Sequence, residues 1–356
     1  MMPAGSPYSP LKIFRHQANL AALRDGQHVA PIHVQLLPTS ICNQACEGCA
    51  YRIPGYSSNE LFNLRDQIPG EKLLEIVSDC AAMGVRAIEI TGGGEPTLHP
   101  DFQRMCEAIL QRDMDLALVS NGTRLDNRLV DLLLRARWVR ISIDAGTAET
   151  YARYRHTTPL VFHNVRNSLR ELCGRRSGED LVVGVGFVVN DVNWREVVTA
   201  AENAKADGAD NFRISALFQP GGSSYFEPFL EDATNLCREA ESLTDSTFRV
   251  FNRFEDRVAD LEQGHPAYRT CWFQQVCTYI GSDLTVYRCC VLGYNRRGVL
   301  GSLENKRFSS LWFSEEMIEN LKQLDARACS LCMYSRTNEA IAYAACQEAR
   351  HENFIG

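Results

Sequence analysis

The stretch HVQLLPTSICNQACEGCAYR, residues 33–52, joins a short apolar segment to three closely spaced cysteines, Cys42, Cys46 and Cys49. A structural zinc site is normally closed by four ligands, and an iron–sulfur cluster is usually held by four cysteines. Three thiols therefore leave one metal position open, as catalytic metal sites do. The stretch predicts a strand followed by a catalytic metal centre, and a zinc site is the alternative.

The composition is that of an ordinary globular protein with many cysteines. Of the 356 residues, 45% are hydrophobic and 14 are cysteines, and the formal net charge is −7. The N-terminal segment lacks the apolar core of a secretory signal, and no run reaches the roughly 20 apolar residues of a membrane helix. We therefore expect a cytoplasmic protein without membrane contact, in the host cytoplasm if a phage encodes it. In a reducing compartment, clustered cysteines indicate metal or redox chemistry rather than disulfides.

Short apolar segments alternate with amphipathic segments of helical length up to about residue 220. This alternation predicts an α/β fold whose parallel strands are joined by right-handed helical crossovers. The expected strands are 33–37, 85–91, 115–120, 139–143, 182–189 and 211–217. The expected helices between them are 71–84, 100–113, 125–137 and 193–208. We therefore expect a partial (β/α)6 TIM-like barrel over residues 33–220, after an N-terminal extension of residues 1–32.

A polar segment follows each of the first four expected strands. The three cysteines follow the first strand, TGGGEPTLHP (91–100) the second, SNGT (120–123) the third and SIDAG (142–146) the fourth. The C-terminal ends of parallel strands meet at one rim, where the active-site residues of such folds gather. The cysteines are therefore expected to belong to an active site on this rim.

The alternation stops after about residue 220. A helical linker is expected at 221–265, followed by a small cysteine-rich domain at 266–356. In this domain CTYIGSDLTVYRCC (277–290) predicts a β-hairpin around the turn GSD, and residues 309–324 predict a helix. The cysteines of this domain are Cys271, Cys277, Cys289, Cys290, Cys329, Cys332 and Cys346.

The C-x3-C-x2-C spacing of Cys42, Cys46 and Cys49 after a first strand resembles the radical S-adenosylmethionine (SAM) superfamily. The resemblance implies that these catalytic cysteines hold a [4Fe–4S] cluster, and that SAM binds the remaining iron. It also implies an external one-electron reductant, whose electron cleaves SAM to a 5′-deoxyadenosyl radical that abstracts a hydrogen atom from the substrate. The open metal position is then filled by SAM.

The segment Gly92, Gly93, Gly94 and Glu95 matches the GGE element of the same superfamily. Glycines let the backbone approach a ligand closely, and a carboxylate suits the ammonium group of SAM. These four residues are therefore implied as SAM contacts.

Three further SAM contacts are implied by the resemblance. Ser142 and Arg155 match positions often used for the ribose and the carboxylate of SAM, and Arg153 is the alternative to Arg155. The superfamily usually has an aromatic residue just before the third cysteine, near the adenine, where this chain has Gly48. Tyr51 is the expected substitute.

The C-terminal cysteines, with their hairpin and C-x2-C pair, resemble the auxiliary-cluster modules of this superfamily. The longer type, called SPASM, carries seven cysteines and two clusters, and the shorter type, called twitch, carries one cluster. The chain looks like the twitch type, which implies one auxiliary [4Fe–4S] cluster. Its implied ligands are Cys271, Cys289, Cys329 and Cys332, and Cys290 could replace Cys289. Whether Cys277, Cys290 or Cys346 binds metal stays open, as does a structural zinc in this module.

The favoured reaction is the isomerisation of a modified base. The flank CAYRIPGYSSNELF (49–62) resembles phage-encoded radical SAM proteins of thymine hypermodification, which include an isomerase acting on a glycyl-modified thymine. The implied partner is a modified thymine nucleotide or DNA, although the net charge of −7 counts against DNA. The candidate donors of the final hydrogen are Tyr51, Tyr56, Cys277 and Cys290.

Two other enzyme classes remain open. Twitch-type enzymes that dehydrogenate an aminocyclitol or sugar alcohol use the auxiliary cluster to take up the second electron. Peptide maturases often carry an N-terminal recognition domain, whereas residues 1–32 are the whole segment before the first expected strand. A non-enzymatic iron–sulfur scaffold or sensor would not need Glu95 and the other rim segments.

Overall fold

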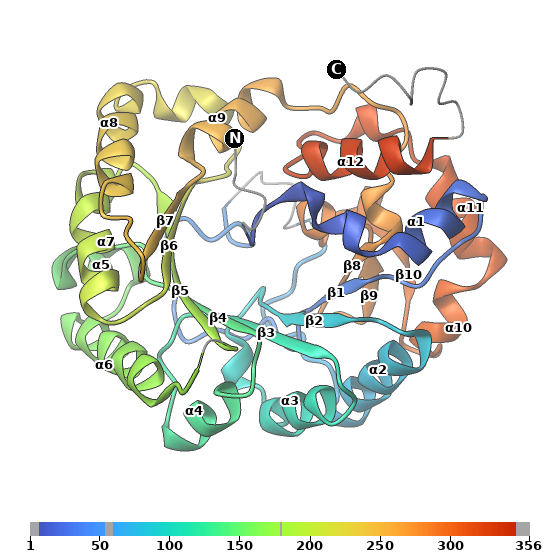
Figure 1. The fold of residues 1–356 in the computed structure, drawn as a ribbon, viewed down its shortest axis with the longest axis horizontal. Helices are drawn as coiled ribbons and strands as arrows, with labels where there is room; N and C mark the ends of the chain where they lie inside the picture. Colours follow the sequence, from blue (N-terminus) through green and yellow to red (C-terminus); the bar gives the residue numbers. More distant parts are fainter. Residues whose placement is uncertain (1–6, 54–59, 179, 347–356) are drawn as a thin grey trace.

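The structure is a computed structural model that describes residues 7–53, 60–178 and 180–346. Its described strands form one curved sheet, and all neighbouring pairs from β1 to β7 are parallel (Figure 1). In sheet order the strands are β10 (Val299–Ser302), β9 (Thr285–Tyr287), β8 (Cys277–Ile280), β1 (His33–Leu36), β2 (Ala87–Ile90), β3 (Asp115–Ser120), β4 (Trp138–Ser142), β5 (Val182–Val189), β6 (Asn211–Ala216) and β7 (Arg249–Asn252). The expected α/β partial barrel is confirmed.

Helices cover the outer face of the curved sheet, and Figure 1 shows α2 to α8 along that face. Alternation along β1 buries Val34 and Leu36 against these helices, so His33 and Gln35 face the interior of the barrel. The helices are α1 (Gln17–Arg24), α2 (Gly70–Met83), α3 (Phe102–Leu110), α4 (Asn127–Leu133), α5 (Ala148–Arg155), α6 (Pro159–Arg175), α7 (Val197–Ala206), α8 (Leu230–Glu241), α9 (Phe254–Gln263), α10 (Phe308–Trp312), α11 (Glu315–Gln323) and α12 (Ser335–Ala345). Among the described residues, none of them is long and apolar enough to cross a membrane.

The region 221–265, expected to be a helical linker, contains a further strand–helix unit. Helix α8 leads into β7, which pairs in parallel with β6, and α9 follows. A strand of four residues between two polar helices gives a weak sequence signal, because a short apolar run fits either type of element. The parallel sheet therefore continues one strand beyond the six expected.

The expected hairpin is present as β8 and β9, and β10 adds a third antiparallel strand to it. Strand β8 also pairs in parallel with β1, with Cys277 opposite His33. The expected helix at 309–324 is divided into α10 and α11, because Ser314 caps the second helix by accepting a hydrogen bond from Met317 N at 3.2 Å. The C-terminal region thus extends the sheet of the barrel.

The N-terminal extension packs on this C-terminal region. The fully buried Trp312 of α10 donates its Nε1–H to Val29 O at 2.8 Å and stacks on His28. Arg24, at the end of α1, donates two hydrogen bonds to Ala344 O on α12. Residues near both ends of the chain are therefore held together beside the barrel.

Replacing Trp312 with Phe removes this donor and leaves the Val29 carbonyl without that partner. We expect Trp312→Phe to lower the free energy of unfolding by about 1–3 kcal/mol, the usual penalty for an unsatisfied buried polar group. Urea unfolding followed by circular dichroism measures the change. Tyr343→Phe on α12, where the ring is 77% exposed, is the control and should change stability by about 0.5 kcal/mol or less. Equal unfolding midpoints for the two variants would contradict a stabilising role for the Val29 contact.

Candidate active site

The three cysteines of the first motif lie on the loop that follows β1. A tight turn brings Cys49 N within 3.2 Å of Cys46 O, so the motif is compact. Burial raises the pKa values of Cys42 and Cys49, and a negative charge on Cys46 would raise them further. Thiols in such surroundings stay protonated unless a cation replaces the protons.

The loop that follows β2 passes directly against the cysteine loop. A Cβ atom on Gly94 would lie 2.1 Å from Ile41 O, which only glycine avoids. Gly92 and Gly93 are confined in a similar way, since a Cβ atom on each would lie 1.9 Å from Gly94 O and 2.4 Å from the Phe62 ring. The glycine run is therefore needed for the close approach of two loops.

Glu95 connects the ends of β2 and β3. Its buried Oε1 accepts hydrogen bonds from Thr97 N, Thr97 Oγ1 and Ser120 Oγ, at 3.1, 2.7 and 2.8 Å. Its Oε2 accepts one hydrogen bond, from Asn121 N at 2.7 Å. A carboxylate oxygen has about two acceptor positions, so Oε2 can also bind a cationic group such as the SAM ammonium.

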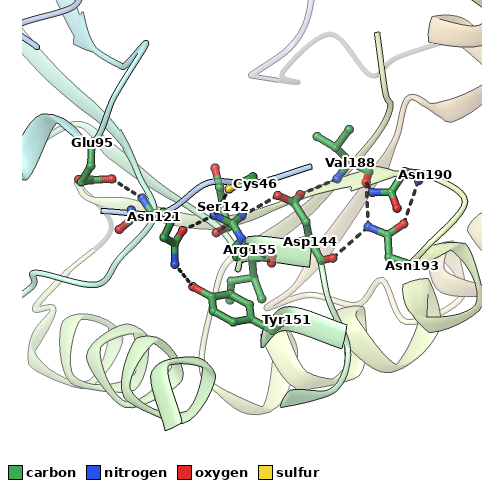
Figure 2. A network of polar contacts seen from close by, with 12 residues as sticks. Cys46, Glu95, Asn121, Ser142, Asp144, Tyr151, Arg155, Val188, Asn190 and Asn193 are labelled. Atoms are coloured by element: carbon green, nitrogen blue, oxygen red, sulfur yellow. Dashed lines mark hydrogen bonds and ion pairs between the residues drawn. The ribbon is translucent and has the colours of Figure 1, made fainter. Parts of the chain in front are cut away.

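Arg155 ties the fourth strand to the cysteine loop (Figure 2). Its buried guanidinium donates to Asp144 Oδ2 at 2.6 Å, Ser142 O at 2.7 Å and Gln44 Oε1 at 2.9 Å. Nη1 also lies 3.7 Å from Cys46 Sγ. Arg155 thus has protein partners on several sides, and its position suits holding the cysteine loop in place.

The neighbouring rim loops are fixed by backbone-directed hydrogen bonds. Asn193, in the loop after β5, donates to Asp144 O and Val188 O, both at 2.9 Å (Figure 2). Arg153, the alternative to Arg155, is exposed and lies 3.4 Å from Val192 O. The arginine at the cysteine loop is therefore Arg155.

Two tyrosines lie close to the cysteine loop but on different sides of it. A Cβ atom on Gly48 would be 2.1 Å from Tyr154 Oη, so Tyr154 occupies the space beside this glycine. Tyr51 points toward the C-terminal region, where its hydroxyl lies 2.6 Å from Tyr279 Oη and its ring stacks on Phe62. Tyr154 is thus the aromatic side chain that fills the place beside Gly48, and the sequence analysis did not select it.

The four expected auxiliary ligands come together. Cys271, Cys289, Cys329 and Cys332 line one pocket, whose walls are largely apolar and include Phe273. Burial raises the pKa of Cys271 to about 12, and negative charge on Cys332 and Cys329 would raise it further. Four thiols around one pocket make a complete ligand set for an iron–sulfur cluster.

Cys277 and Cys290 lie outside that pocket. Cys277 Sγ is 3.6 Å from His33 Nδ1 on β1, and Cys290 Sγ is 3.0 Å from Tyr334 Oη. Cys289, and not Cys290, is therefore the member of this pair that faces the other three thiols. Cys346 is exposed at the end of α12.

The comparisons with known proteins agree with this arrangement. Residues 36–215, half of the chain, match the radical SAM superfamily, and residues 271–333 match SPASM, an iron-sulfur cluster-binding domain. The chain belongs to the radical SAM superfamily. Its cofactors are a SAM-binding [4Fe–4S] cluster, an auxiliary iron–sulfur site and SAM.

Similar proteins catalyse several different reactions. GTP 3′,8-cyclase of Aeromonas hydrophila is 28% identical over 198 residues, 52% of this chain and 51% of the cyclase, so the chain spans about half of that relative. The AdoMet-dependent heme synthase of Methanosarcina barkeri is 22% identical over 332 residues, 86% of this chain and 90% of the synthase. The crystal structure of Streptococcus suis SuiB bound to S-adenosylmethionine has a TM-score of 0.63 at 14% identity, over 90% of this chain and 74% of SuiB. The last likeness is one of fold.

The residues present fit these cofactors. Cys42, Cys46 and Cys49 supply three thiols on one loop beside the free acceptor position of Glu95, and the C-terminal pocket supplies four more thiols. The match of residues 36–215 to the radical SAM superfamily favours an iron–sulfur cluster over zinc at Cys42, Cys46 and Cys49. The sequence analysis missed Gln44 and Asp144, whose roles arise from contacts across the sheet.

Replacing Cys42, Cys46 and Cys49 together with alanine tests the assignment of two iron sites. We expect the variant to lose SAM cleavage and keep about half of its iron, because two clusters of equal size would share it. Iron analysis and the 5′-deoxyadenosine yield of the anaerobically reconstituted protein measure both effects. Replacing Cys329 and Cys332 should instead spare the SAM-binding cluster.

The control for these variants is Cys237→Ala, which changes a buried cysteine on α8 outside both sets and should retain all iron. Complete loss of iron from either cluster variant would show that the two regions do not bind metal independently. Unchanged iron would rule out the assigned ligands.

Arg155→Met tests the buried ion pair at the rim. The change leaves the Asp144 carboxylate buried without its cation, and we expect a loss of about 3–5 kcal/mol in unfolding free energy. Arg155→Met combined with Asp144→Asn should recover part of this loss, because the uncompensated charge is gone. Urea unfolding midpoints compare them with Arg153→Met, an exposed control expected to change stability by about 0.5 kcal/mol or less. A double variant less stable than Arg155→Met would contradict the charge argument.

Proposed function

We propose that this radical SAM enzyme isomerises a glycyl-modified thymine of phage DNA. The position of Tyr51 carries the proposal, because this residue belongs to the flank that resembles thymine-hypermodification proteins. Its hydroxyl lies 2.6 Å from Tyr279 Oη on β8, among the tyrosines of the C-terminal region. This position suits a donor that returns a hydrogen atom to a radical formed in the barrel.

The bound cofactors supply a 5′-deoxyadenosyl radical that abstracts a hydrogen atom from the substrate. Glu95 would hold the ammonium group of SAM, and Arg155 keeps the cysteine loop in place through its hydrogen bond to Gln44. A barrel interior closed to water would protect a reactive radical from side reactions. Glu95 and Arg155 thus position the cofactors, whereas the structure of the substrate determines how the radical rearranges.

An isomerase conserves the composition of its substrate, so one hydrogen atom must be returned for the one abstracted. When Tyr51 returns it, a tyrosyl radical is left, and one electron from the external reductant together with one proton restores the tyrosine. Burial raises the pKa of Tyr51 well above its usual value, which keeps its O–H intact at neutral pH. Tyr279, its hydrogen-bond partner, has its pKa raised by burial as well. Tyr56, another candidate donor, lies outside the described residues.

A second candidate function is the two-electron dehydrogenation of an aminocyclitol or sugar alcohol. The four thiols around one pocket favour it, because a fully ligated auxiliary cluster can take up the second electron. Peptide maturation is the third candidate. Its support is the similar fold of SuiB, which has also been crystallised with the precursor peptide SuiA.

The first experiment is an anaerobic reaction of the holoenzyme with SAM, dithionite and DNA that carries glycyl-modified thymine. We expect 5′-deoxyadenosine and a digested nucleoside with unchanged mass and a new retention time. A product lighter by two hydrogens would instead establish dehydrogenation. DNA with unmodified thymine is the control, and 5′-deoxyadenosine yields that do not depend on the modified base would refute this substrate.

Tyr51→Phe tests the hydrogen-return step in the same assay. The variant should lose most of the isomerised product while substrate-dependent 5′-deoxyadenosine formation continues, because abstraction precedes the return of hydrogen. Full product yield from Tyr51→Phe would exclude Tyr51 as the donor.

A further inference from the structure

The interior face of the sheet carries two arginines below the rim. Arg140 lies on β4 and Arg213 on β6, and the strand neighbours on either side of each pack in the core under the helices. Both arginines therefore face the barrel interior, as does Ser142, two residues after Arg140. They lie on the interior wall next to the expected SAM contact.

The strand between them provides open space. β5 has Gly184 and Gly186 at its interior-facing positions, and Gly186 is in register with both Ser142 and Arg213. A Cβ atom on Gly186 would lie 3.3 Å from Arg140 Cδ, so the Arg140 side chain extends across this glycine. The two guanidinium groups therefore reach into one region above the two glycines of β5.

Neither arginine is neutralised by the protein. Within the described residues, Arg140 and Arg213 form no hydrogen bond or ion pair; Arg140 lies against the Trp138 ring and Arg213 against Tyr8. The Nε of Arg213 is buried and has no hydrogen-bond partner. A buried donor without a partner is rare and costs stability, so it indicates a missing ligand.

The surrounding charges increase this cost. Burial lowers the pKa of Arg213 to about 10, and the charges of Arg140, Arg257 and Arg253 lower it further. Arg253 and Arg257 have acidic partners, Asp256 and Asp260. Arg140 and Arg213 therefore add positive charge to this part of the barrel without an acidic partner among the described residues.

We propose that Arg140 and Arg213 form an anion site that binds a carboxylate or phosphate group of the substrate. Planar guanidinium groups match the two oxygens of either anion. The identity of the substrate rests on the function proposed above: a glycyl-modified thymine nucleotide offers a glycyl carboxylate and a phosphate. The anion site itself rests on the unpaired arginines alone.

The first test uses inorganic sulfate and needs no substrate. The thermal midpoint of the full-length holoenzyme is compared in sodium sulfate and in sodium chloride at equal ionic strength. General salt effects shift the midpoints of all variants alike. A difference between variants in the sulfate-induced shift therefore measures anion binding at the proposed site. We expect sulfate to raise the midpoint of the wild type and of Arg135→Gln, an exposed control on the outer side, more than that of Arg140→Gln or Arg213→Gln. Equal responses of all four proteins would overturn the proposal.

The thermal midpoint in sodium chloride gives a second test, because the direction in which Arg213→Gln shifts it differs between a ligand-binding and a structural arginine. Arg213→Gln should raise the midpoint relative to the wild type, because it removes a cation whose buried Nε has no hydrogen-bond partner. An arginine retained for structure would lower the midpoint when removed. A lower midpoint together with an unchanged sulfate response would refute a ligand-binding role.

Calorimetry with the unreduced, SAM-bound enzyme identifies the source of the anion. The probes are the glycyl-modified thymidine nucleoside, its neutral glycinamide, and the 5′-monophosphate of that amide. If the carboxylate binds here, the acid should bind more tightly than the amide, and Arg213→Gln should weaken the acid about 30-fold or more. If the phosphate binds here, the same loss should appear for the amide monophosphate. Binding of all probes that is unaffected by Arg140→Gln and Arg213→Gln would overturn the proposal.

The sulfate and calorimetry experiments together distinguish the anion-site proposal from the proposed thymine substrate. A sulfate response that depends on the arginines, without binding of any nucleoside, would keep the anion site and refute the thymine substrate. Nucleoside binding and turnover that are independent of both arginines would keep the proposed function and refute the anion site.

Discussion

The close approach of the loop after β2 to the cysteine loop is the constraint on which the rim depends. With a Cβ atom on Gly94 only 2.1 Å from Ile41 O, the two backbones can meet only where the side chain is absent. This contact places Glu95 where it bonds Ser120 and the backbone of Asn121 at the end of β3. Three strand ends are thereby locked to one another before any cofactor binds, and such preorganisation lowers the entropy lost on binding.

The chain uses the arginines of its rim and of its sheet in two ways. Arg155 has a carboxylate, an amide oxygen and two carbonyls around its guanidinium, and it therefore behaves as part of the scaffold. Arg140 and Arg213 lie on the interior side of the same sheet without such partners. Proteins tolerate an uncompensated buried charge chiefly where function requires it, since each one reduces stability. The distribution of partners thus separates the arginines that hold the rim from those that face the substrate space.

The sequence predicted the elements with strong local signals. Six strands and four of the helices between them followed from alternating polarity, and the C-x3-C-x2-C and GGGE segments predicted the rim. Helices α5 and α6, between β4 and β5, were not among the expected elements. Strand β7 was missed because four residues carry too little periodic signal. The choice between Cys289 and Cys290 depends on how the chain turns after β9, and Tyr154 reaches Gly48 from a helix more than 100 residues away in the chain. Such tertiary contacts leave no pattern in a single sequence.

The parallel pairing of β8 with β1 affects how the protein is assembled. His33, near the start of the chain, has Cys277 as its neighbour in the sheet, and the two are separated by 244 residues. A ribosome must therefore synthesise most of the chain before one edge of the first strand is covered. Until then β1 presents unpaired backbone groups beside its three reactive thiols, a state prone to aggregation and oxidation. The C-terminal region is thus also the element that completes folding of the barrel, so it could not be exchanged as an independent module without exposing the first strand.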